Sequence, residues 1–251
     1  MSLAGATEIL FRVNLVPLYM EIRVLYGRHE DDRFGLFLKE VQAHLPHIRH
    51  VSIEAECHFR FIHRRLENAL VSPAPTLEYL SVCFQRVGSQ VTDQLQNFDT
   101  LFGGSTPSLS FLKLRNCNID WNSPLFKGLK YLEIFAPGMA RPTLAVWSDE
   151  IPQLKILSLH SASPFAVHSP FDVERIVTLP SLTHLDISAS LPDCAFAAAH
   201  LDLPVLTSLC LTATDLHTNG RGMQKFLPYV LRHVYGPQEC GVCSSAAVNV
   251  V

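Results

Sequence analysis

Two groups of residues in this sequence have the types that metal or redox chemistry requires. Cys240 and Cys243 form a C-x-x-C pair, which occurs in thiol redox sites and supplies half of a four-cysteine zinc site. One pair cannot complete a tetrahedral zinc site, and this pair lies in the last segment of the chain and not at a strand-to-helix turn. We interpret the C-x-x-C pair as a chance occurrence. The alternative is that the protein is an enzyme with a redox or metal activity at Cys240 and Cys243.

The second group is rich in histidine and falls between residues 44 and 63. His44 and His47 flank Pro46, and His50 falls in a predicted strand, so the spacing does not bring these side chains to one point. We expect solvated or stacking histidines here and no metal site. The members of the group are His44, His47, His50, Cys57, His58 and His63.

Motifs of the common enzyme classes are missing from the sequence. It contains no G-x-S-x-G, no H-E-x-x-H, no phosphate-binding loop and no G-x-G-x-x-G. Gly103 and Gly104 fit a helix stop better than a phosphate cradle. The sequence therefore predicts a protein that is not an enzyme, without catalytic residues and without a cofactor.

The strongest pattern is a six-residue phrase, L-x-x-L-x-L, in which other apolar residues can replace leucine. It recurs at steps of 20 to 32 residues, close to the ~20–29 residues of leucine-rich repeats. Because side chains alternate along a strand, each copy predicts a short strand that buries its leucine-type positions. Cys117 follows one copy where such repeats carry Asn or Cys, and we expect it to cap the backbone. The copies are Tyr19–Val24, Ile48–Ile53, Leu77–Val82, Leu109–Leu114, Leu129–Ile134, Leu154–Leu159, Leu182–Ile187 and Leu206–Leu211.

Apolar residues spaced for one helix face occupy most intervals between these copies. Asp31 or Asp32, and Thr92, are candidate N-terminal caps. Five of the last six copies have a proline just upstream, which ends the preceding helix. The predicted helical segments are Phe34–Leu45, Phe59–Leu70, Thr92–Phe102, Thr143–Asp149, Pro170–Thr178, Asp193–His200 and Gly222–Val234.

The alternation of strand and helix indicates an α/β fold in which the strands lie parallel. Together with the repeated phrase it predicts a leucine-rich-repeat, ribonuclease-inhibitor-like solenoid with a parallel curved sheet and outer helices. We place the irregular solenoid at residues 1–238 and an unstructured tail at residues 239–251. The alternative is a generic doubly wound α/β domain.

The positions between the leucines face the open, concave side of such a sheet and fall into three rows. The first row is His50, Tyr79, Phe111, Tyr131, Ile156, His184 and Ser208. The second row is Ser52, Ser81, Lys113, Glu133, Ser158, Asp186 and Cys210. The third row is Glu54, Cys83, Arg115, Phe135, His160, Ser188 and Thr212.

Large rings gather beside charged residues in the middle of these rows. Aromatic and arginine side chains in one patch are typical of protein-binding hot spots. The alternative is that loops cover the rings or that the rings pack on each other. The predicted partner-binding residues are Tyr79, Phe111, Lys113, Arg115, Tyr131, Glu133, Phe135, Ser158, His160, His184 and Asp186.

Composition restricts the partner and the compartment. Charged residues make up 17% of the chain and the net charge is -3, which argues against a broad nucleic-acid-binding face. Glu8, Arg12, Glu21 and Arg23 interrupt the apolar stretches near the N-terminus, so we predict neither a signal peptide nor a membrane partner. Seven cysteines without a secreted-type spacing favour a reduced protein of the cytoplasm or nucleus.

Several longer pieces of the sequence resemble a known family. The run LFGGSTPSLSFLKLRNCNIDWNSPLFKGLKYLEI (Leu101–Ile134) is similar to the repeat region of fungal F-box proteins with degenerate leucine-rich repeats. The resemblance spans roughly Ser72–Gln238. Its other pieces are PQLKILSL (Pro152–Leu159), LPSL (Leu179–Leu182), FLPYV (Phe226–Val230) and YGPQ (Tyr235–Gln238).

This resemblance implies a protein-binding repeat module, the substrate-recognition part of an F-box-type ubiquitin ligase adaptor. Members of that family use the F-box, an N-terminal helical segment that opens with Leu-Pro, to dock on a cullin-type ligase, while the repeats select the substrate. The N-terminal Leu-Pro of this chain, Leu45-Pro46, leads into a predicted strand, and no F-box is visible. A truncated gene product would keep only the substrate-reading part. The alternative is a free-standing leucine-rich-repeat interaction scaffold without a ubiquitin role.

Overall fold

The computed structural model of the 251-residue chain shows an α/β protein whose described strands are parallel. It forms two compact units, Met1–Lys127 and Gly128–Val251. The residues that the structure describes are 17–24, 32–56, 65–66, 68–85, 98–117, 120, 122–135, 151–160, 176–214 and 245–250.

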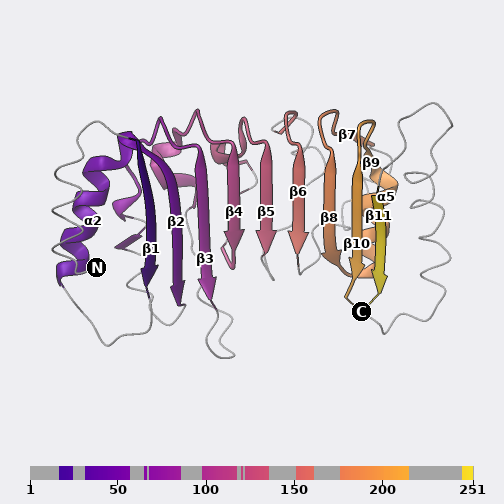
Figure 1. Ribbon diagram of the computed structural model, residues 1–251, viewed down its shortest axis with the longest axis horizontal. Coiled ribbons are helices and arrows are strands. Elements are labelled where there is room, and N and C mark those ends of the chain that lie inside the picture. The colour runs from indigo at the N-terminus through magenta and orange to yellow at the C-terminus, as the bar shows by residue number, and fades with distance from the viewer. Residues whose placement is uncertain are drawn as a thin grey trace. The chain divides into compact units, whose positions relative to one another are not determined.

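Within the described residues of the first unit, four strands form a parallel sheet in the order in which they occur in the chain (Figure 1). They are β1 (Leu18–Val24), β2 (Ile48–Glu56), β3 (Tyr79–Gln85) and β4 (Phe111–Arg115). Helical segments lie between or after these strands, as parallel pairing requires. They are α2 (Asp32–His44), η1 (Leu45–His47), η2 (Phe98–Gly104) and η3 (Pro124–Phe126).

The second unit has the same organisation over its described residues. Its main sheet runs in the order β5, β6, β8, β10 and β11, again with every described pair parallel. These strands are β5 (Tyr131–Phe135), β6 (Ile156–His160), β8 (His184–Ala189), β10 (Ser208–Ala213) and β11 (Ser245–Val250). A short second pair and one helix complete it, namely β7 (Val177–Thr178), β9 (Leu201–Asp202) and α5 (Leu191–His200).

All eight copies of the L-x-x-L-x-L phrase form strands, as predicted. In most copies the first leucine precedes the strand, because its amide closes a turn with the residue three positions earlier. The Leu109 N–H donates to the Thr106 carbonyl at 3.0 Å in the first unit. The Leu182 N–H donates to the Leu179 carbonyl at 3.2 Å in the second. The phrase therefore encodes a turn and then a strand.

Each strand is tied at its start to the preceding repeat. The Lys155 carbonyl accepts from the Thr183 N–H at 2.8 Å, from the His184 N–H at 3.0 Å and from Thr183 Oγ1 at 3.0 Å. The Thr183 carbonyl in turn accepts from the Thr207 N–H and from Thr207 Oγ1. In the first unit the Glu78 carbonyl accepts the corresponding bonds from the next repeat. Satisfying these backbone groups fixes where each strand begins.

From β2 to β4 and from β5 to β10, the strands pair in the register that the repeated phrase predicts. The copy Tyr19–Val24 is an exception, because Tyr19 lies opposite His50 and not opposite Ile48. In the first unit His50 lies opposite Tyr79, and Tyr79 lies opposite Phe111. In the second unit Tyr131 lies opposite Ile156, and Ile156 lies opposite His184. The three predicted rows of outward-facing residues are therefore confirmed within each unit. A slip of one residue would exchange the two faces of a strand, so the buried leucines hold this register.

The leucine-type positions form the core. Leu80 and Leu112 of the first unit and Leu132 of the second are completely buried. Large apolar side chains from the segments outside the strands fill the space against them, including Phe102 and Phe126 in the first unit. The outward-facing positions of β4, β5 and β6 are half-buried or exposed, and of those in β3 only Ser81 is buried. This is the pattern of a sheet that buries one face.

Cys117 caps the end of β4 as predicted. Its thiol is buried and lies 3.6 Å from the Val82 carbonyl and 3.3 Å from the Arg115 carbonyl. The preceding Asn116 has a φ of 54°, and its Nδ2 donates to the Phe84 carbonyl at 2.6 Å. Two successive side chains thus satisfy carbonyls of β3 where the chain leaves β4.

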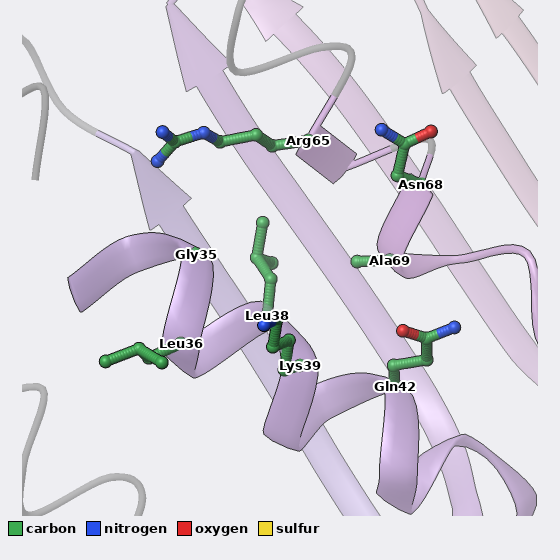
Figure 2. A pocket seen from close by; sticks show the side chains of 8 residues that line it. All are labelled: Gly35, Leu36, Leu38, Lys39, Gln42, Arg65, Asn68 and Ala69. Atoms are coloured by element: carbon green, nitrogen blue, oxygen red, sulfur yellow. The ribbon is translucent and has the colours of Figure 1, made fainter. Parts of the chain in front are cut away.

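Two predicted helices are confirmed. α2 occupies the predicted segment Phe34–Leu45, and its residues Leu38 and Val41 are buried. α5 contains the predicted Asp193–His200 and begins at Leu191, because Ser190 caps it by accepting from the Asp193 N–H at 3.3 Å. Leu66, Ala69 and Leu70 of the predicted Phe59–Leu70 helix are buried. Arg65 and Asn68 of that segment are helical as well (Figure 2), and its remaining residues lie outside the described part of the chain, as do the predicted helices Thr143–Asp149 and Gly222–Val234.

The predicted helix Thr92–Phe102 is wrong at its end. Leu101 is extended, with a ψ of 135°, and Phe102 has a φ of 55°. The Phe102 N–H donates to the Leu70 carbonyl at 2.5 Å and the ring is fully buried, so tertiary packing ends the helix before the glycines. Gly103 continues at a φ of 57°, a conformation that suits glycine, but it follows the end of the helix and is not the residue that stops it.

Two further expectations are corrected by strands. Val177–Thr178, at the end of the predicted helix Pro170–Thr178, forms β7 and pairs with β9. Ser245–Val250 lies in the predicted unstructured tail and instead forms β11, paired in register with β10. An exposed strand at the edge of a sheet offers backbone groups to any extended segment. Because β11 contains no copy of the leucine phrase, the sequence did not predict this pairing.

Substituting a core leucine of the phrase is expected to be costly. Leu157→Ala should lower the free energy of unfolding by about 2–5 kcal/mol, because it removes a buried side chain and leaves a cavity. The matched control is Ser158→Ala, one position along β6 on the outward face, with an expected change of about 0.5 kcal/mol or less. Urea denaturation followed by circular dichroism measures both. Equal losses would contradict the assignment of the two faces.

Gly35 offers a stabilising substitution in α2. Its backbone has no positive φ, and a Cβ there would meet Arg65 Nη1 at 3.7 Å, an ordinary contact. Gly35→Ala should therefore raise the free energy of unfolding by about 0.5–1 kcal/mol, because alanine loses less backbone entropy in a helix. The control is Gly103→Ala, which should destabilise the chain because Gly103 has a φ of 57°. Thermal unfolding of both variants checks this contrast.

Candidate functional site

A stack of rings runs across the outward face of the first unit. The rings of His50 and Tyr79 are 3.9 Å apart between centroids and 7° from parallel. Those of Tyr79 and Phe111 are 4.1 Å apart and 15° from parallel. Tyr19 extends the row with a centroid distance of 5.5 Å and a tilt of 35° to His50. We call these four residues the ring stack.

The register of the sheet produces this stack. Neighbouring parallel strands lie about 4.8 Å apart, so rings at the same position on adjacent strands meet face to face. Because the faces of His50, Tyr79 and Phe111 lie against each other, their edges are left toward solvent. These three side chains are half-buried, and Tyr19 is 75% exposed. The ring stack thus offers an apolar ridge of ring edges with polar groups along it.

Charged and polar side chains flank the ring stack in the other two rows. Glu21 and Arg23 of β1 form an ion pair at 2.6 Å, and Arg23 Nε lies 3.9 Å from a carboxylate oxygen of Glu54. Gln85 donates a hydrogen bond to the same Glu54 side chain. These charges are exposed, so each pair contributes little to stability. They set the charge that this face presents to solvent.

Cys83 lies opposite Glu54 in the sheet, and its surroundings argue against a nucleophile. Burial raises the pKa of the Cys83 thiol, and the charges of Arg115 and Lys113 oppose that shift only in part. Burial likewise raises the pKa of Cys210 in the second unit, with Asp186 adding to the shift. A thiol with a raised pKa is protonated near neutral pH and reacts slowly.

The outward face of the second unit has a different arrangement. The Tyr131 hydroxyl donates to Glu133 Oε2 at 2.8 Å, so the ring is held over its own strand. Phe135 and His160 lie 6.2 Å apart between ring centroids, and His160 Nε2 is 3.9 Å from Asp186 Oδ2. This unit therefore presents hydrogen-bonded and charged groups.

The predicted partner-binding residues divide between the two units. Tyr79, Phe111, Lys113 and Arg115 lie on the outward face of the first unit. The others lie on that of the second, and all of them are half-buried except His184, which is exposed. They are Tyr131, Glu133, Phe135, Ser158, His160, His184 and Asp186.

Two members of the ring stack were missing from the predicted site. His50 was already in the first predicted row, so its place beside Tyr79 could have been read from the alignment of the phrase. Tyr19 opens the weakest copy, YMEIRV, and aligns with His50 only through an irregularity between Leu18 and Tyr19. The sequence does not show that irregularity, because it depends on how β1 pairs.

No group of three or more potential metal ligands occurs within the described part of the chain. His50 stacks on Tyr79 and His47 is exposed, as expected. His44, by contrast, is buried at the end of α2 and not solvated. Cys57, His58, His63, Cys240 and Cys243 lie outside the described residues. The described helices include none that is long and apolar enough to cross a membrane.

Comparison with known proteins does not assign a family. No protein-family model matches the chain, and no curated protein matches its sequence. The resemblance to fungal F-box proteins therefore rests on the residues quoted above and stays a prediction.

His50 should make the stability depend on pH. Burial lowers the pKa of His50 from its ordinary value of 6.5, against the opposing charge of Glu21. The unfolded chain then binds the proton more readily, so stability is full above the unfolded pKa and is lost as the pH falls through it toward the folded pKa. His50→Phe keeps a ring in the stack and removes this loss. We expect a smaller drop in Tm between about pH 7.5 and pH 5.5 for this variant.

The matched control is His184→Phe, at the corresponding row position of the second unit. This variant should keep the pH dependence of stability that arises from His50. Thermal unfolding at the two pH values measures the three proteins. The prediction is wrong if Tm falls between the two pH values by as much in His50→Phe as in the unsubstituted chain. In that case protonation of His50 is not the cause of the pH dependence.

Proposed function

We propose that this chain is a protein-binding repeat module of the leucine-rich-repeat type, and that the outward face of its parallel sheet binds a polypeptide. Its proposed role is the substrate-recognition part of an F-box-type ubiquitin ligase adaptor. The observation that carries the binding proposal is the ring stack of the first unit, with 75% of Tyr19 exposed at its end.

The chemistry of the ring stack favours a polypeptide over a sugar or a nucleic-acid base. Sugars and bases bind aromatic side chains by stacking on ring faces. The faces of His50 and Tyr79 lie against neighbouring rings and are not available for this. Ring edges beside Lys113, Arg115 and Glu54 instead match the mixture of aromatic and charged groups found at protein-binding hot spots.

The repeat architecture supports the solenoid part of the proposal. In a solenoid each repeat contacts only its neighbours and presents the same positions on one face. Within each unit the phrase produces the same turn, the same strand start and the same outward rows. Such a face is extended and can read several side chains of a partner at once.

The ubiquitin role rests on the family resemblance, and a free-standing interaction scaffold is the alternative. The two differ in one partner, the adaptor that links an F-box protein to a cullin. Affinity capture of the whole chain from its own cells, followed by mass spectrometry, separates them. Recovery of cullin and its adaptor supports the ligase role, and recovery of other partners without ligase subunits supports the scaffold.

The ring stack should be required for capture of the partner. Tyr79→Ala with Phe111→Ala removes two stacked rings, and we expect a loss of about 2 kcal/mol or more, ~30-fold in affinity, as for hot-spot residues. The matched control is Arg49→Ala on β2, which removes an exposed charge that belongs to none of the three rows.

Circular dichroism first establishes that the double variant is folded. Capture of the same proteins at the same yield by a folded double variant would overturn the sheet-face proposal. Tyr131→Ala, measured in parallel, tests whether the second unit contributes to the same binding.

A further inference from the structure

Strand β11 extends the sheet of the second unit without belonging to the repeated pattern. It pairs in parallel with β10, from Ser245 opposite Ser208 to Val250 opposite Ala213 (Figure 1). The step from Ser208 to Ser245 is longer than any step between two copies of the leucine phrase. β11 is therefore part of the sheet because of its pairing with β10 and not because of the repeat.

The register of the sheet shows which residues suit the strand beside β10. Between β8 and β10, Leu185 lies opposite Leu209 and Ile187 lies opposite Leu211. Leu209 and Leu211 are 3% and 2% exposed, so both belong to the core. A strand that continued the repeat would place leucine or isoleucine opposite each of them, because the register decides which residues share a face.

β11 has smaller residues at these two positions. Ala246 lies opposite Leu209, and Val248 lies opposite Leu211. Alanine and valine offer less apolar area than leucine, and the burial of apolar area is what makes one strand bind more tightly than another. The backbone hydrogen bonds of a parallel pair, in contrast, are the same for any sequence without proline. β11 thus satisfies the backbone edge of β10 with less apolar area than a copy of the phrase would bring.

We propose that β11 is a replaceable strand, and that the edge of β10 is a strand-addition site for an extended segment of a partner polypeptide. The partner segment has leucine or isoleucine at every second position, pairs in parallel with β10 and takes the place of β11. Binding of this kind derives its affinity from main-chain hydrogen bonds and its specificity from the side chains at alternate positions. The site lies in the second unit and does not depend on binding by the ring stack of the first.

The test uses the whole chain and the labelled peptide SSLALNVV, which copies residues 244–251 with leucine in place of Ala246 and Val248. Fluorescence anisotropy measures its Kd. The unchanged sequence, SSAAVNVV, should bind about tenfold more weakly or less tightly still, because it brings less apolar area. The control peptide SSLLANVV has the same composition as SSLALNVV. It should bind about fivefold more weakly, because only one of two adjacent leucines can face the core.

Two variants of the chain should change the affinity for SSLALNVV in opposite directions. Ala246→Leu with Val248→Leu strengthens β11 as a competitor, so the peptide should bind about tenfold more weakly. Ala247→Pro with Val248→Pro removes two successive amides of β11, and neighbouring amides of a strand point to opposite sides, so one of them is a bond to β10. The peptide should then bind about tenfold more tightly. The matched control is Ala247→Ser with Val248→Thr, which keeps both amides and should leave the affinity within about threefold.

Circular dichroism establishes that each variant is folded, and if the proline variant is not, the leucine variant decides alone. The proposal is overturned if SSLALNVV binds none of these proteins, since β11 is then a permanent part of the sheet. It is also overturned if the leucine variant binds the peptide as tightly as the unsubstituted chain does. Loss of the peptide from folded Tyr79→Ala with Phe111→Ala would assign it to the ring stack and overturn the β10 site, so the two proposals are tested separately.

Discussion

The interaction on which the structure depends is the parallel backbone ladder between neighbouring repeats. A carbonyl at the start of one strand, such as that of Lys155, accepts the amides of Thr183 and His184 from the next repeat. Buried backbone groups need partners, and here each repeat supplies them to the one beside it. The leucines fix which face of the strand turns inward, so the ladder has one register. Every outward row then follows from that register.

The ring stack is a direct consequence of this constraint. Residues that share a position in the phrase become neighbours across the sheet, although His50 and Phe111 are far apart in the chain. The ring stack is built by repetition, and any repeat protein with aromatic residues in one row would form something similar.

Stacking these rings stabilises the outward side of the sheet. It also covers the ring faces on which a planar ligand would stack. The edges of the stacked rings remain exposed to solvent, with charged side chains beside them. A structural requirement of the sheet therefore shapes the class of partner that we propose for this face.

The sequence by itself determined eight of the strands, their parallel pairing and the three rows from β2 onward, because a six-residue phrase repeated eight times specifies both the period and the face of each of these strands. It also determined the cap at Cys117, since that residue holds a fixed place after the phrase. Only the tertiary structure decided the stacking of His50 on Tyr79, the early end of the helix at Phe102 and the strand β11. Each of these depends on a contact between residues distant in the chain, such as the bond from Phe102 to Leu70, and local pattern carries no information about such contacts.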